Sequence, residues 1–361
     1  MSALAPGSVI GILGSGQLGR MLAVAAAQLG QQVHIYSDAT GPAFDVASRH
    51  TVGSYEDTKA IAAWAREVDV VTYEFENVPL AAAAAAAAEK PVRPGARALE
   101  VAQDRLVEKQ FVASLGLPVA PFATIDSDAD LTHALQQIGT PALLKTRRFG
   151  YDGKGQVRIA APSDAATALD QVGRAPAILE GFVDFEYEVS VILVRDLGGN
   201  TVSYDIPINT HVDGILATST VPSPLPSSIA SKAVEIAELI AGALDYVGVL
   251  AVELFFVGAD AEAPLVVNEM APRVHNSGHW TLDACLVCQF ENHIRAVSGW
   301  PIAPTDRSVD AVMTNLIGAD VNDWQALAAD SDTCLHVYGK REARPGRKMG
   351  HFTSVSPKTQ S

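Results

Sequence analysis

The N-terminal stretch places the strongest constraint on what this chain can fold into. Residues Val9–Leu13 are apolar and predict a buried strand, and the complete GxGxxG turn Gly14–Gly19 follows at once. A predicted helix that ends at Gly30 then leads into a second strand, Val33–Tyr36. A strand, a glycine turn, a helix and a strand make a βαβ unit, which requires two parallel strands in one sheet.

The glycine turn does not by itself identify its ligand. Asp38 follows the second strand at roughly the 20-residue distance of an acid that binds the ribose of a dinucleotide. The amides and the positive dipole of a helix N-terminus nevertheless bind any phosphate. A dinucleotide such as NAD(P), a different phosphate and a merely tight turn are therefore equally compatible with the pattern.

Charge and cysteine content restrict the partners and the compartment. Lys and Arg number 26 against 41 Asp and Glu, so the net charge of -15 repels nucleic acid and anionic membranes. The apolar run Ala81–Ala88 is too short to cross a membrane and predicts a plain helix. Three cysteines cannot all pair, and no signal peptide is visible, which favours a cytoplasmic protein. Cys285 and Cys288 lie in a helical pattern, Leu282–Val297, and are interpreted as buried structural thiols.

The predicted elements change character after the first hundred residues. The strand Asp69–Tyr73 ends in the acidic segment Glu74–Asn77, at the edge where open α/β sheets bind ligands. Pro91–Gly95 marks a linker before a charged helix predicted over Ala98–Leu115. Short strands separated by glycine turns then indicate an α+β unit. They are predicted at Pro141–Lys145, Gln156–Ile159, Ala177–Leu179, Glu188–Val194, Thr201–Ile206 and Val249–Val257, with helices at Asp164–Val172 and Ser227–Leu244.

A lysine and a glycine-rich hairpin follow one another in the second unit. Lys145 closes an apolar strand, where an ammonium is costly to bury unless an anion meets it, although a strand-end lysine that reaches solvent is common. The segment Arg147–Gln156 then combines glycines with basic residues between two strands. Such a hairpin can place backbone amides over a polyphosphate and close as a flexible lid.

Acids on apolar strands predict a nucleotide and metal site. Glu180 leads into Gly181–Val183, beside which an adenine ring would fit, although a strand connection with surface acids is the simpler interpretation of that stretch alone. Glu253 stands inside an apolar strand and needs a partner. Glu269, with the Asn268 amide beside it, ends another strand. Two carboxylates and an amide form a hard-oxygen site that suits Mg²⁺.

Polar chemistry continues after that strand and returns near residue 340. The segment Arg273–His279 would face the group that accepts a phosphoryl. His279 and His293 are interpreted as hydrogen-bonded packing residues, and zinc is not expected at His275 and His279, which lack a helical context and a third ligand. The basic loop Tyr338–Lys348 contains glycines and a proline that would fix its shape, so it is either an anion clamp or a solvated run.

In this order, the motifs resemble those of ATP-grasp enzymes, and most closely the 5-(carboxyamino)imidazole ribonucleotide synthase family of purine biosynthesis. They read GSGQLGRM, YEFENV, AQDRLVEK, KTRRFGYDGKGQ, NEMAPRVHNSGHW and RPGRKMGH and extend over nearly all 361 residues. The resemblance implies a mixed α/β and α+β fold with a Rossmann-like N-terminal domain, 1–104. It also implies an ATP-grasp domain, 105–298, with a lid at about 118–180, and a substrate-binding segment, 299–361, packed on it.

The resemblance also implies residue roles, which we state as expectations. ATP would contact Arg105, Lys145, Gly150, Tyr151, Asp152, Gly153, Lys154, Gly155, Gln156, Glu180, Gly181, Phe182, Val183, Glu188, His211, Asn268 and Glu269. Mg²⁺ would be held by Glu253 and Glu269. Aminoimidazole ribonucleotide would be gripped by Gly16, Gln17, Leu18, Glu74, Tyr151, Lys340, Arg347 and Lys348, the last three mainly through its phosphate.

The implied reaction converts ATP, bicarbonate and aminoimidazole ribonucleotide into the N-carboxylated product, ADP and phosphate. Transfer of the γ-phosphoryl to bicarbonate gives carboxyphosphate, which a closed lid must protect from water. We expect Arg273, His275 and Asn276 to hold bicarbonate and carboxyphosphate, and Asp152 and Lys340 to handle the amine proton. The resemblance further implies a homodimer, for which the sequence offers no interface signature.

Other functions fit parts of the sequence. Another ATP-grasp carboxylate–amine ligase, such as formate-dependent glycinamide ribonucleotide transformylase, would share the ATP site. A nicotinamide oxidoreductase would be built on Gly14–Gly19 and Asp38. A non-catalytic nucleotide-binding protein would leave Glu253, Glu269 and Arg273 together without an evident role.

Overall fold

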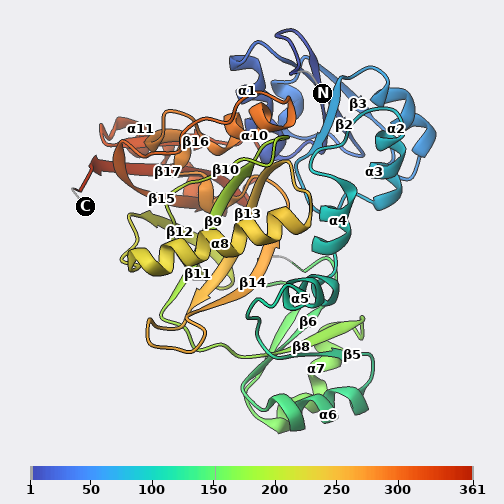
Figure 1. Ribbon diagram of the computed structural model, residues 1–361, viewed down its shortest axis with the longest axis vertical. Coiled ribbons are helices and arrows are strands. Elements are labelled where there is room, and N and C mark those ends of the chain that lie inside the picture. The colour runs from blue at the N-terminus through green and yellow to red at the C-terminus, as the bar shows by residue number, and fades with distance from the viewer. Residues whose placement is uncertain (1–2, 151, 360–361) are drawn as a thin grey trace.

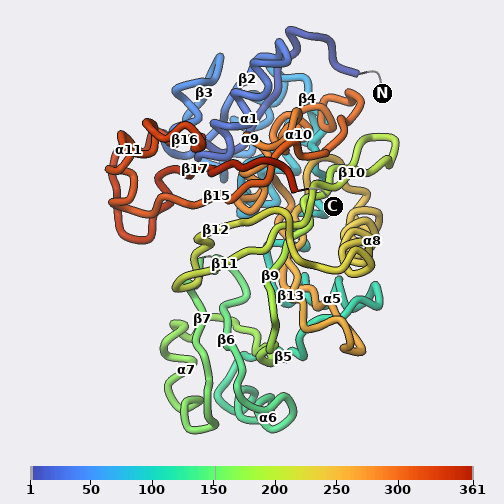
Figure 2. Tube along the Cα trace, turned by 90° about the vertical axis from the view of Figure 1, so that its left-hand side faces the viewer, coloured from blue at the N-terminus to red at the C-terminus, as the bar shows by residue number. Residues whose placement is uncertain are grey.

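The computed structural model describes residues 3–150 and 152–359, and three sheets organise them (Figure 1). The N-terminal sheet lies at one end of the molecule and the lid sheet at the other, with the central sheet between them (Figure 1, Figure 2). Within the described ranges no helix is both long and apolar enough to cross a membrane.

The N-terminal unit is built on a parallel sheet with the strand order β3-β2-β1-β4. Its elements are β1 (Val9–Leu13), α1 (Gln17–Gln28), β2 (Gln32–Ser37), η1 (Pro42–Asp45), β3 (Arg49–Val52), α2 (Thr58–Ala65), β4 (Val70–Tyr73) and α3 (Leu80–Ala87). Ile10 and Ile12 share a core with α1, whereas Leu13 shares another with Trp64 of α2. The predicted βαβ unit is confirmed, and because β1 and β4 are parallel neighbours, the glycine turn and Glu74 meet at one edge.

The lid is a small antiparallel sheet with its own core. Its strand order is β5-β8-β6-β7, and Leu144 and Leu179 are fully buried between the sheet and its helices. Its elements are β5 (Phe122–Ile125), α6 (Asp128–Ile138), β6 (Ala142–Thr146), β7 (Gln156–Ile159), η2 (Pro162–Asp164), α7 (Ala165–Gln171) and β8 (Ala177–Gly181). Lys145 and Glu180 stand on neighbouring strands, since β6 pairs with β8.

The central sheet joins strands from residues 187–271 with the C-terminal strands in the order β14-β13-β9-β11-β12-β15-β17-β16, with β10 beside β9. The strands are β9 (Tyr187–Arg195), β10 (Thr201–Ser203), β11 (Ile208–Val212), β12 (Ile215–Val221), β13 (Gly248–Phe256), β14 (Leu265–Ala271), β15 (Val309–Ile317), β16 (Thr333–Val337) and β17 (Lys348–Pro357). The segment after residue 299 is therefore continuous with this sheet through the β12–β15 pairing.

Helices cover both faces of the central sheet. One face carries α4 (Ala96–Ala102), α5 (Arg105–Ser114) and α8 (Ser227–Ala243), which share a core with β9 and β13. The other carries α10 (Gln289–Val297), which also packs on α1 and so ties the N-terminal unit to the sheet. The remaining elements are η3 (Asn276–Gly278), α9 (Thr281–Ala284), η4 (Gly318–Asp323) and α11 (Trp324–Ala329).

Two predicted helices are wrong in the same way. The pattern Ala98–Leu115 is split into α4 and α5 because Asp104 has extended backbone and caps α5, its Oδ1 accepting from the Leu106 amide at 3.0 Å. The pattern Leu282–Val297 is split into α9 and α10 by residues 285–288. Both cysteines of that segment are half-buried rather than fully buried, and neither is in a disulfide with another described residue.

Candidate active site

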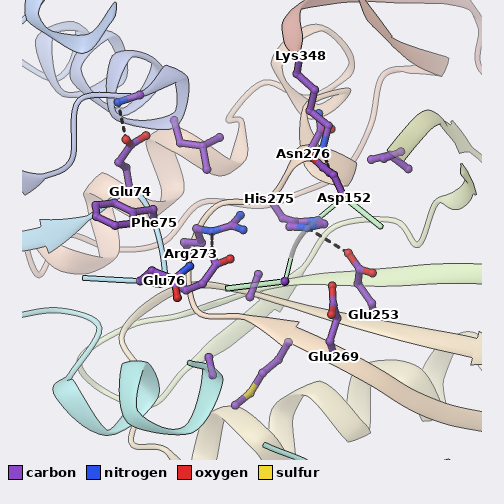
Figure 3. A pocket seen from close by; sticks show the side chains of 18 of the residues that line it. Glu74, Phe75, Glu76, Asp152, Glu253, Glu269, Arg273, His275, Asn276 and Lys348 are labelled. Atoms are coloured by element: carbon purple, nitrogen blue, oxygen red, sulfur yellow. Dashed lines mark hydrogen bonds and ion pairs between the residues drawn. The ribbon is translucent and has the colours of Figure 1, made fainter. Parts of the chain in front are cut away.

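A cavity of about 390 Å³ opens where the N-terminal, lid and central sheets approach one another (Figure 3). Its lining combines acids, bases and amides from segments far apart in the sequence. Among the predicted site residues it contains Gly16, Gln17, Leu18, Glu74, Arg105, Gly150, Asp152, His211, Glu253, Glu269, Arg273, His275, Asn276 and Lys348. The fold thus brings most of the polar motifs to one place.

The two predicted metal-binding carboxylates face each other across neighbouring strands. Glu253 of β13 is in register with Glu269 of β14, and a bulge leaves Asn268 as the extra residue beside them. Burial and the Glu269 charge raise the pKa of Glu253 to about 8. Burial opposes ionisation of Glu269 as well, but Arg105, whose Nη1 is 2.7 Å from Glu269 Oε2, lowers its pKa to about 2. Adjacent hard oxygens that repel one another fit a divalent cation such as Mg²⁺.

Lys145 and Glu180 form a buried pair behind the carboxylates. Lys145 is 7% exposed, and its Nζ lies 2.9 Å from Glu180 Oε2. Lys109 of α5 is 3.8 Å from the same oxygen and also donates to the Asn268 carbonyl at 2.7 Å. Burial opposes ionisation of Glu180, yet the two lysines lower its pKa. Two ammonium groups on one carboxylate leave one positive charge in excess, which suits a polyphosphate.

A chain of buried hydrogen bonds fixes the orientation of His275. Ser219 Oγ donates to Asn209 Oδ1 at 2.7 Å, and Asn209 Nδ2 donates to Ser190 Oγ at 3.0 Å. Ser190 Oγ lies 2.7 Å from Ser277 Oγ, which is 2.9 Å from His275 Nδ1. The same Nδ1 accepts from the Ser277 backbone amide at 3.4 Å. Nδ1 is thereby an acceptor, so the proton of neutral His275 lies on Nε2.

The position of this proton determines which hydrogen bond His275 can make. Its Nε2 is 3.1 Å from Glu253 Oε1 and donates to it (Figure 3). Burial, followed by the charge of Arg273, holds the pKa of His275 well below its ordinary value. The imidazole therefore stays neutral near physiological pH and acts as a hydrogen-bond donor rather than a cation.

Arg273 and Asn276 are already engaged with protein partners. Arg273 Nε donates to Glu76, and burial of the guanidinium is outweighed by this carboxylate, which raises the Arg273 pKa. Asn276 exchanges two side-chain hydrogen bonds with Asn315 of β15, at 3.0 and 2.7 Å. Both side chains still line the cavity, so they present fixed rather than mobile groups to a small anion.

The glycine turn binds a carboxylate of the protein itself. Glu74 Oε1 accepts from the Gly16 amide at 2.5 Å, and Oε2 accepts from the Gly19 amide at 2.9 Å. These amides belong to the start of α1, which a dinucleotide pyrophosphate would need. Because Glu74 already accepts from these amides, the turn does not offer them to a pyrophosphate. A ribose-binding role for Asp38, and with it the nicotinamide alternative, therefore has no structural support.

The described part of the lid hairpin contacts the central sheet on the far side of the cavity. Asp152 Oδ1 lies 2.8 Å from Lys348 Nζ at the start of β17. A Cβ on Gly153 would come within 3.2 Å of Gly214, so the hairpin touches the turn between β11 and β12. Arg105 Nη2 reaches the Gly150 carbonyl at 3.3 Å. Tyr151, expected to contact both ligands, lies outside the described residues.

The remaining predicted ATP contacts lie around the lid hairpin. Glu188 pairs with His211, and this hydrogen bond outweighs burial and raises the His211 pKa. Arg158 stands 4.8 Å above the ring of Phe182, which is 39% exposed. Gly181 belongs to β8, with Val183 just beyond it, while Lys154, Gly155 and Gln156 carry the lid hairpin into β7. None of these except His211 lines the described cavity.

The basic loop at 338–348 is held by backbone contacts. Lys340 Nζ donates to the Lys348 carbonyl at 2.5 Å, and Arg347 Nη1 donates to the Glu342 carbonyl at 3.0 Å. Burial, then the Arg347 charge, lowers the pKa of Lys340 to about 8. Lys348 lines the cavity, whereas Lys340 and Arg347 are not among the residues that line it.

Comparison with known families covers most of the chain. Residues 8–103 match the ribonucleotide synthetase preATP-grasp domain, 110–290 the ATP-grasp domain, and 311–361 the phosphoribosylaminoimidazole carboxylase C-terminal domain. A curated N5-carboxyaminoimidazole ribonucleotide synthase of Brucella melitensis is 51% identical over 361 residues, covering 99% of either chain. The chain belongs to the N5-carboxyaminoimidazole ribonucleotide synthase family.

Solved structures of the synthase family agree with this assignment. The Staphylococcus aureus N5-carboxyaminoimidazole synthetase complexed with ADP superposes with a TM-score of 0.93 at 33% identity, covering 99% of this chain and 95% of that one. The Aspergillus clavatus synthase in complex with ADP and 5-aminoimidazole ribonucleotide gives 0.91 at 30% identity, covering 98% and 94%. The chain is an ATP-grasp ligase of this synthase family.

Several buried polar residues beside the cavity were not identified from the sequence. Lys109 and Glu108 are buried beside the carboxylates, and Glu108 Oε1 accepts from the Met270 amide at 2.5 Å. A signal existed, because Lys109 shares the inward face of α5 with Leu106 and Val112, at helical spacing. No sequence pattern identified Asn315, because its hydrogen bonds with Asn276 depend on the pairing of β15 with β12.

Proposed function

We propose that this chain carboxylates 5-aminoimidazole ribonucleotide with ATP and bicarbonate, as its family membership indicates, and that the described residues divide the reaction among them. The observation that carries the proposal is the register that sets Glu253 opposite Glu269, with the buried Lys145 close enough for its charge to lower the Glu269 pKa. In this division residues 105–298 bind ATP, while 1–104 and 299–361 bind the ribonucleotide.

The phosphoryl step relies on charges that are in place before ATP arrives. Lys145 and the lid amides from Gly150 to Gln156 offset the charge that develops on the transferred phosphoryl group. Glu253 and Glu269 would hold Mg²⁺, whose charge would stabilise the nucleotide phosphates. Arg105 links Glu269 to the lid carbonyl at Gly150, so it couples lid closure to the ATP side of the cleft.

Bicarbonate would bind beside the paired carboxylates. Arg273 supplies the positive charge for bicarbonate and carboxyphosphate, and its pairing with Glu76 limits its reach to one position. The Asn276 amide would donate its second N–H to bicarbonate, because the first is bonded to Asn315. His275 would keep the adjacent Glu253 in position through its Nε2 contact. The closed lid excludes water while carboxyphosphate releases CO₂ and phosphate.

Aminoimidazole ribonucleotide would lie between the glycine turn and the basic loop. Since Glu74 occupies the Gly16 and Gly19 amides, we place the phosphate on Lys340, Arg347 and Lys348, and the ribose and base near Gly16–Leu18. The exocyclic amine loses a proton as it bonds to CO₂. Asp152 and Lys340, which both contact Lys348, are the groups we assign to that proton.

The proton assignment has a direct test. Asp152→Asn should lower carboxylation by on the order of 100-fold while ATP binding is kept, because general acid–base groups contribute about 100- to 10,000-fold. Full carboxylation by Asp152→Asn, with an unchanged ratio of product to ADP, would remove Asp152 from this role.

The compartment and the assembly are part of the same proposal. The three cysteines, which form no disulfide among the described residues, suit the reducing cytoplasm. A homodimer is implied by the family resemblance, and light scattering of the purified chain would measure it.

One coupled assay tests the proposed reaction. ADP release should require both bicarbonate and aminoimidazole ribonucleotide for full rate, and carbon from labelled bicarbonate should appear in the ribonucleotide. If formate supported phosphate release without bicarbonate, the chain would instead be a related formate-dependent ligase.

A further inference from the structure

A cluster of three metal-ligand side chains lies outside the cleft, under α9. Asp283 comes from α9, His336 from β16 and His351 from β17, and one ligand atom of each lies within 4.8 Å of the others. His336 and His351 are directly opposite one another in the β16–β17 register. Their rings are stacked, with centroids 4.6 Å apart and planes 17° apart. Sheet register and helix packing thus hold the three donors in fixed positions.

One of these donors has an unsatisfied buried nitrogen. His351 is fully buried, and its Nε2 has no hydrogen-bond partner among the described residues. Its Nδ1 is 2.8 Å from the Tyr338 hydroxyl, which leaves Nε2 as the nitrogen available to a ligand. A buried imidazole nitrogen without a partner is unfavourable, and it needs an explanation. A metal ion supplies one, because ligating histidines typically donate their other ring N–H to an oxygen such as this hydroxyl.

The structure assigns a zinc site to Asp283, His336 and His351. His336 Nε2 lies 2.9 and 3.0 Å from the two Asp283 oxygens, so an ion would replace the proton that these groups share. Zinc bonds of about 2.0–2.2 Å hold tetrahedral donors roughly 3.3–3.5 Å apart. The Asp283–His336 pair would therefore open slightly, and the His351 ring, whose ligand atom is within 4.8 Å of the other two, would turn towards the ion. Two imidazoles and a carboxylate favour zinc over Mg²⁺, which prefers oxygen ligands alone.

The fourth position is open to solvent. The His336 side chain is 31% exposed, so an ion or a water can enter from solvent.

The site would fasten the hairpin that carries the basic loop. The cluster ties β16 and β17 to α9, and the loop 338–348 runs between these two strands. His279, which lines the cleft, has its ring 4.9 Å from that of His351. Bound zinc would therefore hold the ends of the loop that presents Lys340, Arg347 and Lys348. Zinc binding itself does not depend on the proposed reaction.

Zinc alone is the probe for the test. The full chain is dialysed against a small excess of Zn²⁺ with Mg²⁺ at saturating concentration, and retained zinc is measured by atomic absorption. We expect one zinc per chain, and a rise in thermal unfolding temperature with zinc. Asp283→Asn and His336→Gln should each weaken zinc binding by at least about 10- to 100-fold, the loss that even an outer-sphere partner causes.

Two matched variants serve as controls. His133→Gln, at an exposed histidine of α6, and Glu253→Gln, in the cleft, should both keep the zinc. The inference is overturned if the wild-type chain retains no zinc, if the Asp283→Asn/His336→Gln double variant retains it, or if Glu253→Gln loses it. Circular dichroism shows whether each variant is folded.

Discussion

The two sides of the cleft are built in different ways. The strand side consists of Lys145, Glu180, Glu253 and Glu269, which stand on neighbouring strands and are paired within the protein. The loop side consists of the basic loop 338–348, whose Lys340 and Arg347 donate to backbone carbonyls. The charges of the strand side are thus fixed in ion pairs before a ligand binds, whereas Lys340 and Arg347 of the loop side are held through backbone carbonyls and keep their charge for an incoming phosphate. We expect changes on the strand side to affect turnover, and changes on the loop side to affect ribonucleotide binding.

The largest effect should come from Lys145→Met. The variant removes the ammonium nearest Glu180 and the charge that would meet the phosphoryl group, so kcat should fall on the order of 100- to 1,000-fold. ADP formation at saturating substrates measures it, and Lys232→Met, at an exposed lysine of α8, is the matched control. A kcat within tenfold of the wild-type value would contradict the division of roles.

A smaller effect, and a different one, is expected for Lys348→Ala. A charge-assisted hydrogen bond contributes about 1.5–3 kcal/mol, so the KM for aminoimidazole ribonucleotide should rise roughly 10- to 150-fold. The KM for ATP should stay within a few-fold of wild type. If the KM for ATP rose as much as that for the ribonucleotide, the two sides would not be separable.

The loop side should also respond to pH through Lys340. Because burial lowers its pKa to about 8, the ammonium is charged below that pH and neutral above it. The KM for the ribonucleotide should be lowest between about pH 6.5, where the phosphate is mostly dianionic, and pH 8, and should rise up to tenfold per unit above it. Lys340→Arg should remove the rise, because arginine stays protonated. A wild-type KM that is flat from pH 7 to pH 9.5 would exclude Lys340.

Salt should produce the smallest difference. The loop side is partly exposed, so raising ionic strength to about 0.5 M should increase the KM for the ribonucleotide a few-fold through screening. The buried pairs of the strand side should leave kcat nearly constant. Steady-state rates over a series of KCl concentrations measure both responses. If kcat and the KM for the ribonucleotide changed equally with salt, the proposed difference between the two sides would be wrong.

The same contrast explains what could be predicted from the sequence. Glu253 and Glu269 were recognisable because an acid in an apolar strand needs a partner, and strand register then sets the geometry. The helix breaks at Asp104 and between Cys285 and Cys288 could not be recognised, because helical periodicity continues through both segments. The hydrogen bonds from the glycine turn to Glu74 could not be predicted either, because they depend on the pairing of β4 with β1.

The continuity of the central sheet has a consequence for how the protein is made. Strands β13 and β14, which carry Glu253 and Glu269, emerge from the ribosome before β15 and β17. Until those later strands are translated, the edge of β12 that pairs with β15 has unsatisfied amides and carbonyls. A nascent chain stalled after residue 300 should therefore recruit holding chaperones more strongly than one released after residue 357.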